Sequence, residues 1–168
     1  MQLDLRISRM FAVAIVILIA TGALAGLAVA APEQTRETYV GQVEPICKAN
    51  TEANERFLSG VRKQIKEGKL RVAAAEFAQA AAASAKSVKQ IKGVAQPAAD
   101  KPKLTKWIGY LEDEQALLSE IGKALKAGKK SKVPALSLRL VHTGNLANSQ
   151  VFSFEFNYCE VDTSKLGG

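Results

Sequence analysis

Two cysteines, Cys47 and Cys159, have the chemistry that is easiest to assign in this chain. They lie far apart in the sequence, which contains no C-x-x-C or C-x-x-C-H pattern, so neither a metal site nor attached haem is indicated. Cysteine pairs oxidise and persist as disulfides in compartments outside the reducing cytosol. We therefore predict one structural disulfide between them; the alternative is two buried free thiols.

A second group of residues could form a polar site. Its members are four amides and one carboxylate, Asn50, Asn54, Asn145, Asn148 and Glu155. If a helix from Cys47 runs antiparallel to a helix that ends at Cys159, these residues fall on one inward seam. A buried polar group without a partner costs about 1–3 kcal/mol. The seam predicts either a network that fixes the register of the two helices or a pocket for a small ligand.

Patterns typical of catalysis are missing from the sequence. His142 is the one histidine, and the chain contains no Glu-x-x-His pair, no H-E-x-x-H and no glycine-rich phosphate loop. The acidic run 112–114 is better explained as a solvated helix face with lysine partners than as paired catalytic acids. We expect no catalytic residue, no metal and no cofactor, and hence a protein that is not an enzyme.

The composition is that of long helices with a basic surface. Hydrophobic residues make up 48% of the 168-residue chain, and 23 Lys and Arg face 16 Asp and Glu, for a net charge of +7. The excess of positive charge favours an anionic partner such as a lipid head group or a wall polymer. Because no aromatic residues alternate with the basic ones, nucleic-acid binding is not expected.

Residues 1–30 have the pattern of an export leader. Arg6 and Arg9 precede a run of apolar and small residues that ends in Ala28-Val29-Ala30, a small-x-small cleavage signature. The run is also long enough to stay as a single-pass membrane anchor. Either way, the rest of the chain is expected outside the cytoplasm, secreted or held at the plasma membrane by its N-terminus.

After this leader we expect a lead-in segment at 31–42, as coil or an extra helical turn, and one domain at 43–168. The predicted helices cover about 43–67, 69–92, 101–127 and 131–158. Pro45 suits the first turn of the first helix, and Gly68 and Gly128 suit left-handed C-caps. The alternation of aromatic residues in 151–158 leaves a strand open as the alternative there.

Helices of similar length joined by short links predict an all-α, up-down-up-down four-helix bundle that follows the N-terminal signal or anchor helix. In that topology the first helix starts at the end of the bundle where the fourth helix finishes. Cys47 and Cys159 lie at those two places, so the fold and the disulfide support each other.

The two cysteine-bearing ends also resemble a known group of proteins. The stretch Val43-Glu44-Pro45-Ile46-Cys47-Lys48-Ala49-Asn50, and Asn145-Leu146-Ala147-Asn148 with the Phe-rich run to Tyr158-Cys159, are similar to an uncharacterised group of exported helical proteins of high-GC Gram-positive bacteria. The resemblance covers most of the region after the leader. It implies export and the disulfide, and it brings no activity or site residue with it.

The sequence thus leads to two functional hypotheses. The first is an extracytoplasmic, non-enzymatic helical module that binds or scaffolds a partner at the cell envelope, either a protein, an anionic lipid or a wall polymer. The alternative is a small-ligand carrier or sensor that uses the polar seam between the first and last helices.

Overall fold

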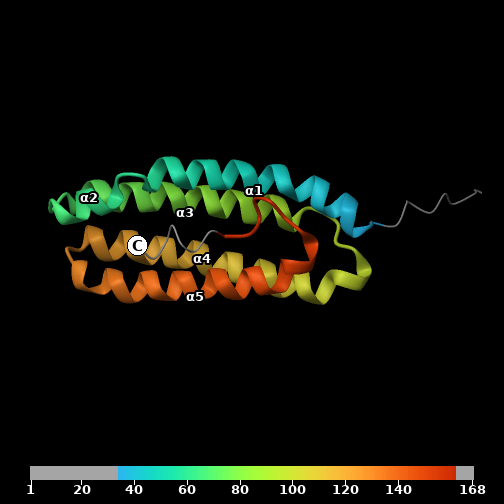
Figure 1. Ribbon diagram of the computed structural model, residues 1–168. Coiled ribbons are helices and arrows are strands. Elements are labelled where there is room, and N and C mark those ends of the chain that lie inside the picture. The colour runs from blue at the N-terminus through green and yellow to red at the C-terminus, as the bar shows by residue number, and fades with distance from the viewer. Residues whose placement is uncertain (1–33, 162–168) are drawn as a thin grey trace, which may run out of the picture. The chain divides into compact units, whose positions relative to one another are not determined.

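The computed structural model describes residues 34–161, and the predicted leader at 1–30 lies outside these described residues. Within them the chain is all-helical, and four long helices pack as a bundle, as predicted (Figure 1). The long helices are α1 (Arg36–Leu58), α3 (Leu70–Lys92), α4 (Lys101–Lys126) and α5 (Val133–Val151). The short ones are α2 (Val61–Lys66) and the 3-10 turns η1 (Ala98–Asp100), η2 (Lys130–Lys132) and η3 (Phe152–Phe154).

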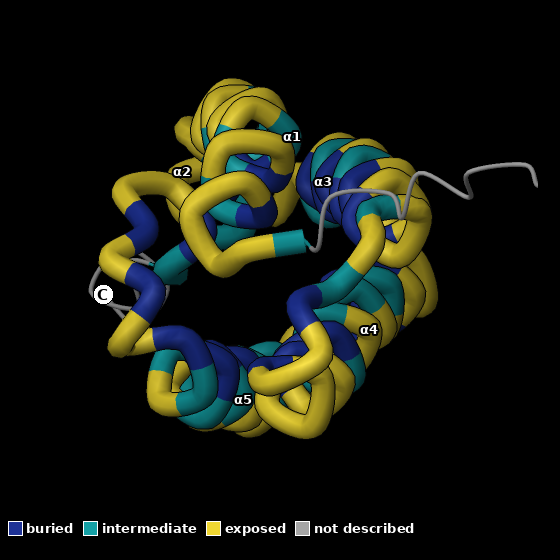
Figure 2. The backbone as a smooth tube through the Cα atoms, turned by 90° about the vertical axis from the view of Figure 1, so that its right-hand side faces the viewer, coloured by how far each residue is buried: buried dark blue, intermediate teal, exposed yellow. Residues whose placement is uncertain are grey.

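Successive long helices run in alternating directions (Figure 1). α3 packs against α1 and α2 on one side and against α4 on the other, and α4 packs against α5. The fourth side, between α1 and α5, is crossed by the segment after α5 (Figure 2). The bundle is therefore closed by three helix–helix interfaces and one segment that is not α-helical, which we call the C-terminal strap (152–161).

α1 begins at Arg36, so the lead-in segment contributes helical turns rather than coil. Thr35 caps it: the Thr38 N–H donates to Thr35 Oγ1 at 3.2 Å, and the Thr35 N–H donates to Thr38 Oγ1 at 3.0 Å. Pro45 therefore lies inside the helix and not in its first turn, where the sequence analysis put it. Its ring leaves the carbonyl of Gly41 without a helical donor. Both residues are exposed, so water can solvate that carbonyl.

The predicted first helix is interrupted at Ser59 and Gly60, after which α2 continues to Lys66. The other two glycines that end helices behave as predicted. Gly68 and Gly128 have φ values of 75° and 71°, the left-handed region that glycine enters at no steric cost. In both links the next residue donates its N–H to the carbonyl five positions back, at 2.8 Å. This pattern satisfies helix-end carbonyls with backbone alone.

α3 and α4 approach each other closely because the contact is made of small residues. The buried face of α3 is largely alanine, and Gly122 of α4 lies against it. A Cβ atom at Gly122 would meet the Ala74 carbonyl oxygen at 3.2 Å and Phe77 Cβ at 3.3 Å. The alanine run thus brings two backbones together as well as favouring helix.

α5 ends at Val151, earlier than predicted, and the strap that follows consists of the single 3-10 turn η3 and then a segment without regular secondary structure. Glu155 adopts the left-handed conformation with φ 54° and turns the chain. Phe154 and Phe156 then point into the core, where their rings stack 5.6 Å apart and Phe156 stacks on Trp107 at 5.6 Å. The alternation of aromatic residues therefore arises from a 3-10 turn followed by a left-handed residue, which buries Phe154 and Phe156 and leaves Phe152 and Tyr158 exposed.

The predicted disulfide is present in the structure. Cys47 of α1 bonds to Cys159 of the strap, with Cα atoms 5.0 Å apart and a sequence separation of 112 residues. Polar contacts support it on both sides: Glu44 Oε1 accepts the N–H groups of Asn157 and Tyr158, and Thr51 Oγ1 donates to the Tyr158 carbonyl at 3.3 Å. The strap is thereby attached to α1 along about two helical turns.

We expect the double variant Cys47→Ala/Cys159→Ala to lose about 2–4 kcal/mol of unfolding free energy, because the closed loop is long. Urea unfolding followed by circular dichroism measures this loss. Helical content should be kept, since the helices still pack on one another. A dithiol reductant should lower the stability of the parent chain and leave the variant unchanged; equal stability of the two proteins without reductant would contradict the prediction.

Gly122→Val should destabilise the bundle by about 1–3 kcal/mol, because its side chain meets the backbone of α3. Gly109 is a matched control in the same helix, since a Cβ there meets nothing within 4 Å. Gly109→Ala should stabilise by about 0.5–1 kcal/mol through helix propensity alone. Thermal unfolding of both variants measures these changes. The prediction requires that Gly122→Val lowers the melting temperature and that Gly109→Ala raises it.

Candidate functional site

The two asparagines of α1 face α3 and not α5. Asn54 Nδ2 donates to Asn50 Oδ1 and to Ser84 Oγ, each at 3.3 Å, and Ser84 Oγ donates to Asn50 Oδ1 at 3.4 Å. This small network joins α1 to α3. The predicted seam between the first and last helices does not hold for these two residues, because α3 is the long helix against which α1 packs.

The other three members of the predicted seam lie elsewhere. Asn148 is half-buried and bonds the strap: its Nδ2 donates to the Val161 carbonyl at 2.9 Å, and the Val161 N–H donates to its Oδ1 at 2.8 Å. Asn145 is exposed on α5, and Glu155 is exposed where the strap turns. The structure therefore joins Asn54 to Asn50 by a hydrogen bond, whereas Asn148 bonds the strap. A ligand-binding role for these residues stays a prediction.

A polar layer does cross the core, made of partly different residues. The buried apolar side chains form two clusters, one around Trp107 and one around Ile121. Between them α1 contributes Asn50 and Asn54, α3 contributes Ser84 and Ser87, α4 contributes Glu114 and α5 contributes Gly144. At this level along the bundle, each of the four long helices therefore presents polar side chains or a glycine to the core instead of apolar side chains.

Glu114 is the ionisable member of this layer, and the sequence analysis placed it on a solvated face instead. Its neighbours Glu112 and Asp113 are exposed, which fits a solvated acidic face, whereas Glu114 points inward. Burial raises the pKa of its carboxyl to about 8, and its Oε1 atom is buried without a hydrogen-bond partner in the structure. A signal existed: Glu114 lies three positions after Leu111 and three before Leu117, on the apolar stripe of α4.

One further oxygen in the layer is unpartnered. Asn54 Oδ1 is buried without a hydrogen bond, although its amide nitrogen donates twice. Buried polar atoms normally find a protein or water partner. Glu114 Oε1 and Asn54 Oδ1 could accept a hydrogen bond from water or from a donor group of a ligand. These two atoms are the observation that still supports the small-ligand hypothesis.

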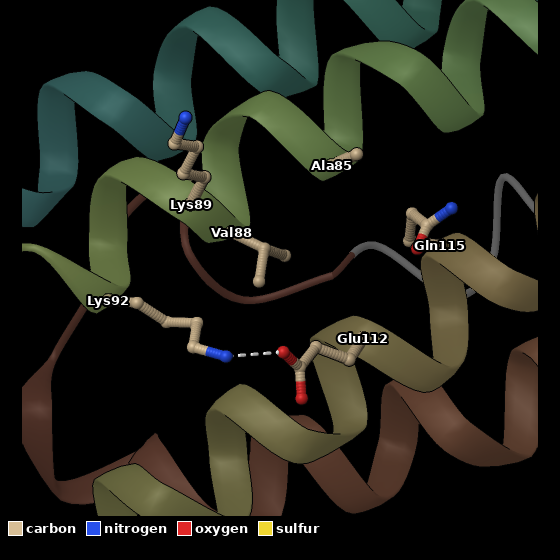
Figure 3. A pocket seen from close by; sticks show the side chains of 6 residues that line it. All are labelled: Ala85, Val88, Lys89, Lys92, Glu112 and Gln115. Carbon is tan, nitrogen blue, oxygen red and sulfur yellow. Dashed lines mark hydrogen bonds and ion pairs between the residues drawn. The ribbon is translucent and has the colours of Figure 1, made fainter.

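Two hollows open at the surface of the described residues 34–161, and neither is lined by a residue of this layer. The first lies between α3 and α4 and encloses about 280 Å³ (Figure 3). It is lined by Ala85, Val88, Lys89, Lys92, Glu112 and Gln115. The hollow is open to solvent, and the ion pair of Lys92 Nζ with Glu112 Oε1, 2.8 Å long, crosses its floor. Ligand pockets normally enclose most of their ligand, so this hollow is a poor candidate.

In the part of the chain that the structure describes, no group of three or more His, Cys, Asp and Glu residues is arranged to hold a metal ion. His142 is exposed on α5. None of the helices between residues 34 and 161 is both long enough and apolar enough to cross a lipid bilayer.

Positive charge is concentrated at one end of the bundle. The α1–α3 connection and the α4–α5 link lie at the same end (Figure 1). We call their segments 61–71 and 122–132 the basic tip. Its basic residues, all exposed, are Arg62, Lys63, Lys66, Lys69, Arg71, Lys123, Lys126, Lys129, Lys130 and Lys132. Glu67 is the acidic residue of these segments and pairs with Lys69 at 2.8 Å and Lys63 at 3.9 Å.

The opposite end is electrostatically more balanced. Arg36, at the start of α1, reaches across to Asp100 before α4, with Nε 2.9 Å from Oδ2. Asp100 is only 5% exposed, and the hydrogen bonds from Arg36 hold the pKa of its carboxyl below the usual value. The same guanidinium lies 4.7 Å from the ring centroid of Phe154. Arg36 therefore connects three segments of the fold: the start of α1, the segment before α4 and the C-terminal strap.

The raised pKa of Glu114 predicts a pH-dependent stability. The group takes up a proton on folding between about pH 4.5 and pH 8, so the unfolding free energy should fall as pH rises through that window. The slope is at most about 1.4 kcal/mol per pH unit. Glu114→Gln should flatten this part of the profile and be the more stable form at pH 8, as measured by urea unfolding.

Asp113→Asn is the matched control, since it removes the same charge from the exposed face of α4. A profile for Glu114→Gln that falls as steeply as that of the control would show that Glu114 is solvated in the folded protein.

Comparisons of the chain with protein-family models, with curated proteins and with solved structures found no match. The resemblance at the two cysteine-bearing ends therefore stays a prediction, and the function has to be argued from the molecule itself.

Proposed function

We propose that this chain is an extracytoplasmic, non-enzymatic helical module that binds an anionic partner at the cell envelope. Residues 1–30 act in this proposal as a cleaved signal peptide or as a retained single-pass anchor. The Cys47–Cys159 bond supports an extracytoplasmic location, since disulfides of this kind persist under oxidising conditions.

The proposal rests on the positive charge of the protein surface, taken together with an interior that the protein's own side chains fill. Between residues 34 and 161 the core is occupied by the protein's own side chains, and the best-formed hollows are shallow and external. Binding by such a body takes place on its outside. The whole chain carries a net charge of +7, and much of the excess is exposed Lys and Arg. Such a surface attracts anions and repels cations.

The catalytic classes gain no support from the residues described. The single histidine is exposed, and the one carboxyl with a strongly raised pKa among the described residues, that of Glu114, is buried and does not line either surface hollow. General acid–base chemistry needs a titrating group that a substrate can reach. A structural role for Glu114 in the polar layer is sufficient to account for it.

The test is retention on envelope material. The protein, recovered from its own envelope and medium fractions, should sediment with isolated envelopes at about 0.15 M salt and be released at about 1 M, where the screening length falls from about 8 Å to about 3 Å. Intact mass of the same sample should begin at residue 31 and lack two hydrogens if the leader is cleaved and the disulfide formed. A protein that stays in the supernatant at both salt concentrations would overturn the proposal.

A further inference from the structure

We infer that the basic tip is the binding surface of this protein and that its partner is a linear polyanion. The inference rests on the proposed function and adds the place of binding and the chemistry of the partner. Its starting point is the concentration of ten exposed Lys and Arg residues in two short segments that contain one acidic residue, Glu67.

The fold, and not the sequence order, brings the two segments together. They are separated by the whole of α3 and most of α4, yet both connections lie at one end of the bundle (Figure 1). Both also pack on the same apolar cluster: Val61 and Ile65 from the first segment contact it, as does Leu125 from the second. Their charged side chains therefore project from one shared apolar base.

Helix stability explains only part of this charge. Lysines in the last turn of a helix interact favourably with its dipole, which accounts for Lys66 of α2 and for Lys123 and Lys126 of α4. Positive charge at a helix N-terminus has the opposite sign of interaction. Lys69 and Arg71 nevertheless lie at the start of α3, as Lys132 does at the start of α5, and neither first turn holds an acidic residue.

The helix ends at the tip do not need these side chains as caps either. At Gly68 and Gly128 the backbone itself completes the hydrogen bonding of the last turn. The tip thus keeps ten basic side chains close together with one acidic residue among them, and some of these, such as Lys69 and Arg71, lie where positive charge opposes the helix dipole. An arrangement of this kind is explained by an anion that neutralises it on binding.

The residue types at the tip favour a polymer over a membrane or a nucleic acid. The large apolar residues of the two segments are buried or half-buried, so none is free to insert into lipid as surface-binding helices require. The segments hold no aromatic residue on which a base could stack. Eight of the ten basic residues are lysines, which act as hydrated point charges and suit a row of phosphate or carboxylate groups.

The place of the tip on the bundle agrees with this partner. α1 begins at the opposite end, near Asp100 at the start of α4. α4 has 26 residues, which corresponds to about 39 Å of helix. The tip is therefore at the end of the bundle opposite the start of α1, where an extended polymer can reach it.

The test compares two triple variants of the full chain. Lys126→Gln/Lys129→Gln/Lys130→Gln removes three charges from the tip. Lys101→Gln/Lys103→Gln/Lys106→Gln removes the same number from exposed positions at the other end of α4. The probe is inorganic polyphosphate at fixed salt, with affinity measured by isothermal titration calorimetry. Each lysine close to a polyanion contributes to the binding free energy. The tip variant should therefore bind polyphosphate about 10- to 100-fold more weakly than the parent chain, and the control variant less than about threefold more weakly.

Each other outcome has a definite meaning. Equal loss in both variants would overturn the tip as the site while leaving general electrostatic binding, and with it the proposed function, in place. A parent chain that binds neither polyphosphate nor envelopes would overturn both. If the tip bound phosphatidylglycerol vesicles more strongly than polyphosphate, a linear polymer would be rejected as the partner and a membrane surface would take its place. Thermal unfolding of each variant shows that it is folded, since all six substituted positions are exposed.

Discussion

The bundle depends on how α1 is attached. Its extensive helix contact is with α3, and the C-terminal strap occupies the place where a fourth helix interface would close the bundle (Figure 2). The remaining attachment comes from the Cys47–Cys159 bond, from Glu44 and Thr51 to the strap backbone, and from Arg36 to Asp100. A covalent cross-link is effective here because it joins segments 112 residues apart, whose encounter is otherwise entropically costly. The apolar strap residues then fill the core beside Trp107.

A polar layer divides the core of the bundle into two parts. Two apolar clusters are separated by a layer in which the helices present amides, serines, a glycine and the carboxyl of Glu114. Buried polar groups of this kind stabilise less than apolar ones, but they penalise any shift of one helix along another, because the groups then lose their partners. The hydrogen bonds of Asn50 and Asn54 to Ser84 set the register of α1 on α3 in this way. Register at this interface also decides whether the cysteine of α1 lies beside the strap.

The two ends of the bundle differ in what their charges do. At the end where α1 begins, Arg36 is used internally, in contact with a carboxylate and with an aromatic ring. At the basic tip ten exposed basic residues accompany one acidic residue, Glu67, which pairs with Lys63 and Lys69. The proposed binding surface and the internal contacts of Arg36 are thereby at opposite ends of the bundle (Figure 1), so a change of charge at the tip need not disturb those contacts.

The helical class, the disulfide and part of the helix boundaries follow from the sequence alone. The alanine run and the glycines at 68 and 128 act locally, so the bounds of α3 and α4 agree with the prediction within a residue. The start of α1, its break at Ser59 and Gly60 and the early end of α5 were not predicted, because they depend on tertiary contacts. The sequence also did not determine which helices touch. The asparagine seam was built on α1 beside α5, whereas α1 lies on α3, and the tip emerged only when two distant links met at one end. Periodicity tells which face of a helix is inward, and Glu114 was on that face; it does not tell which neighbour the face meets, because that choice depends on packing and closure of the whole bundle.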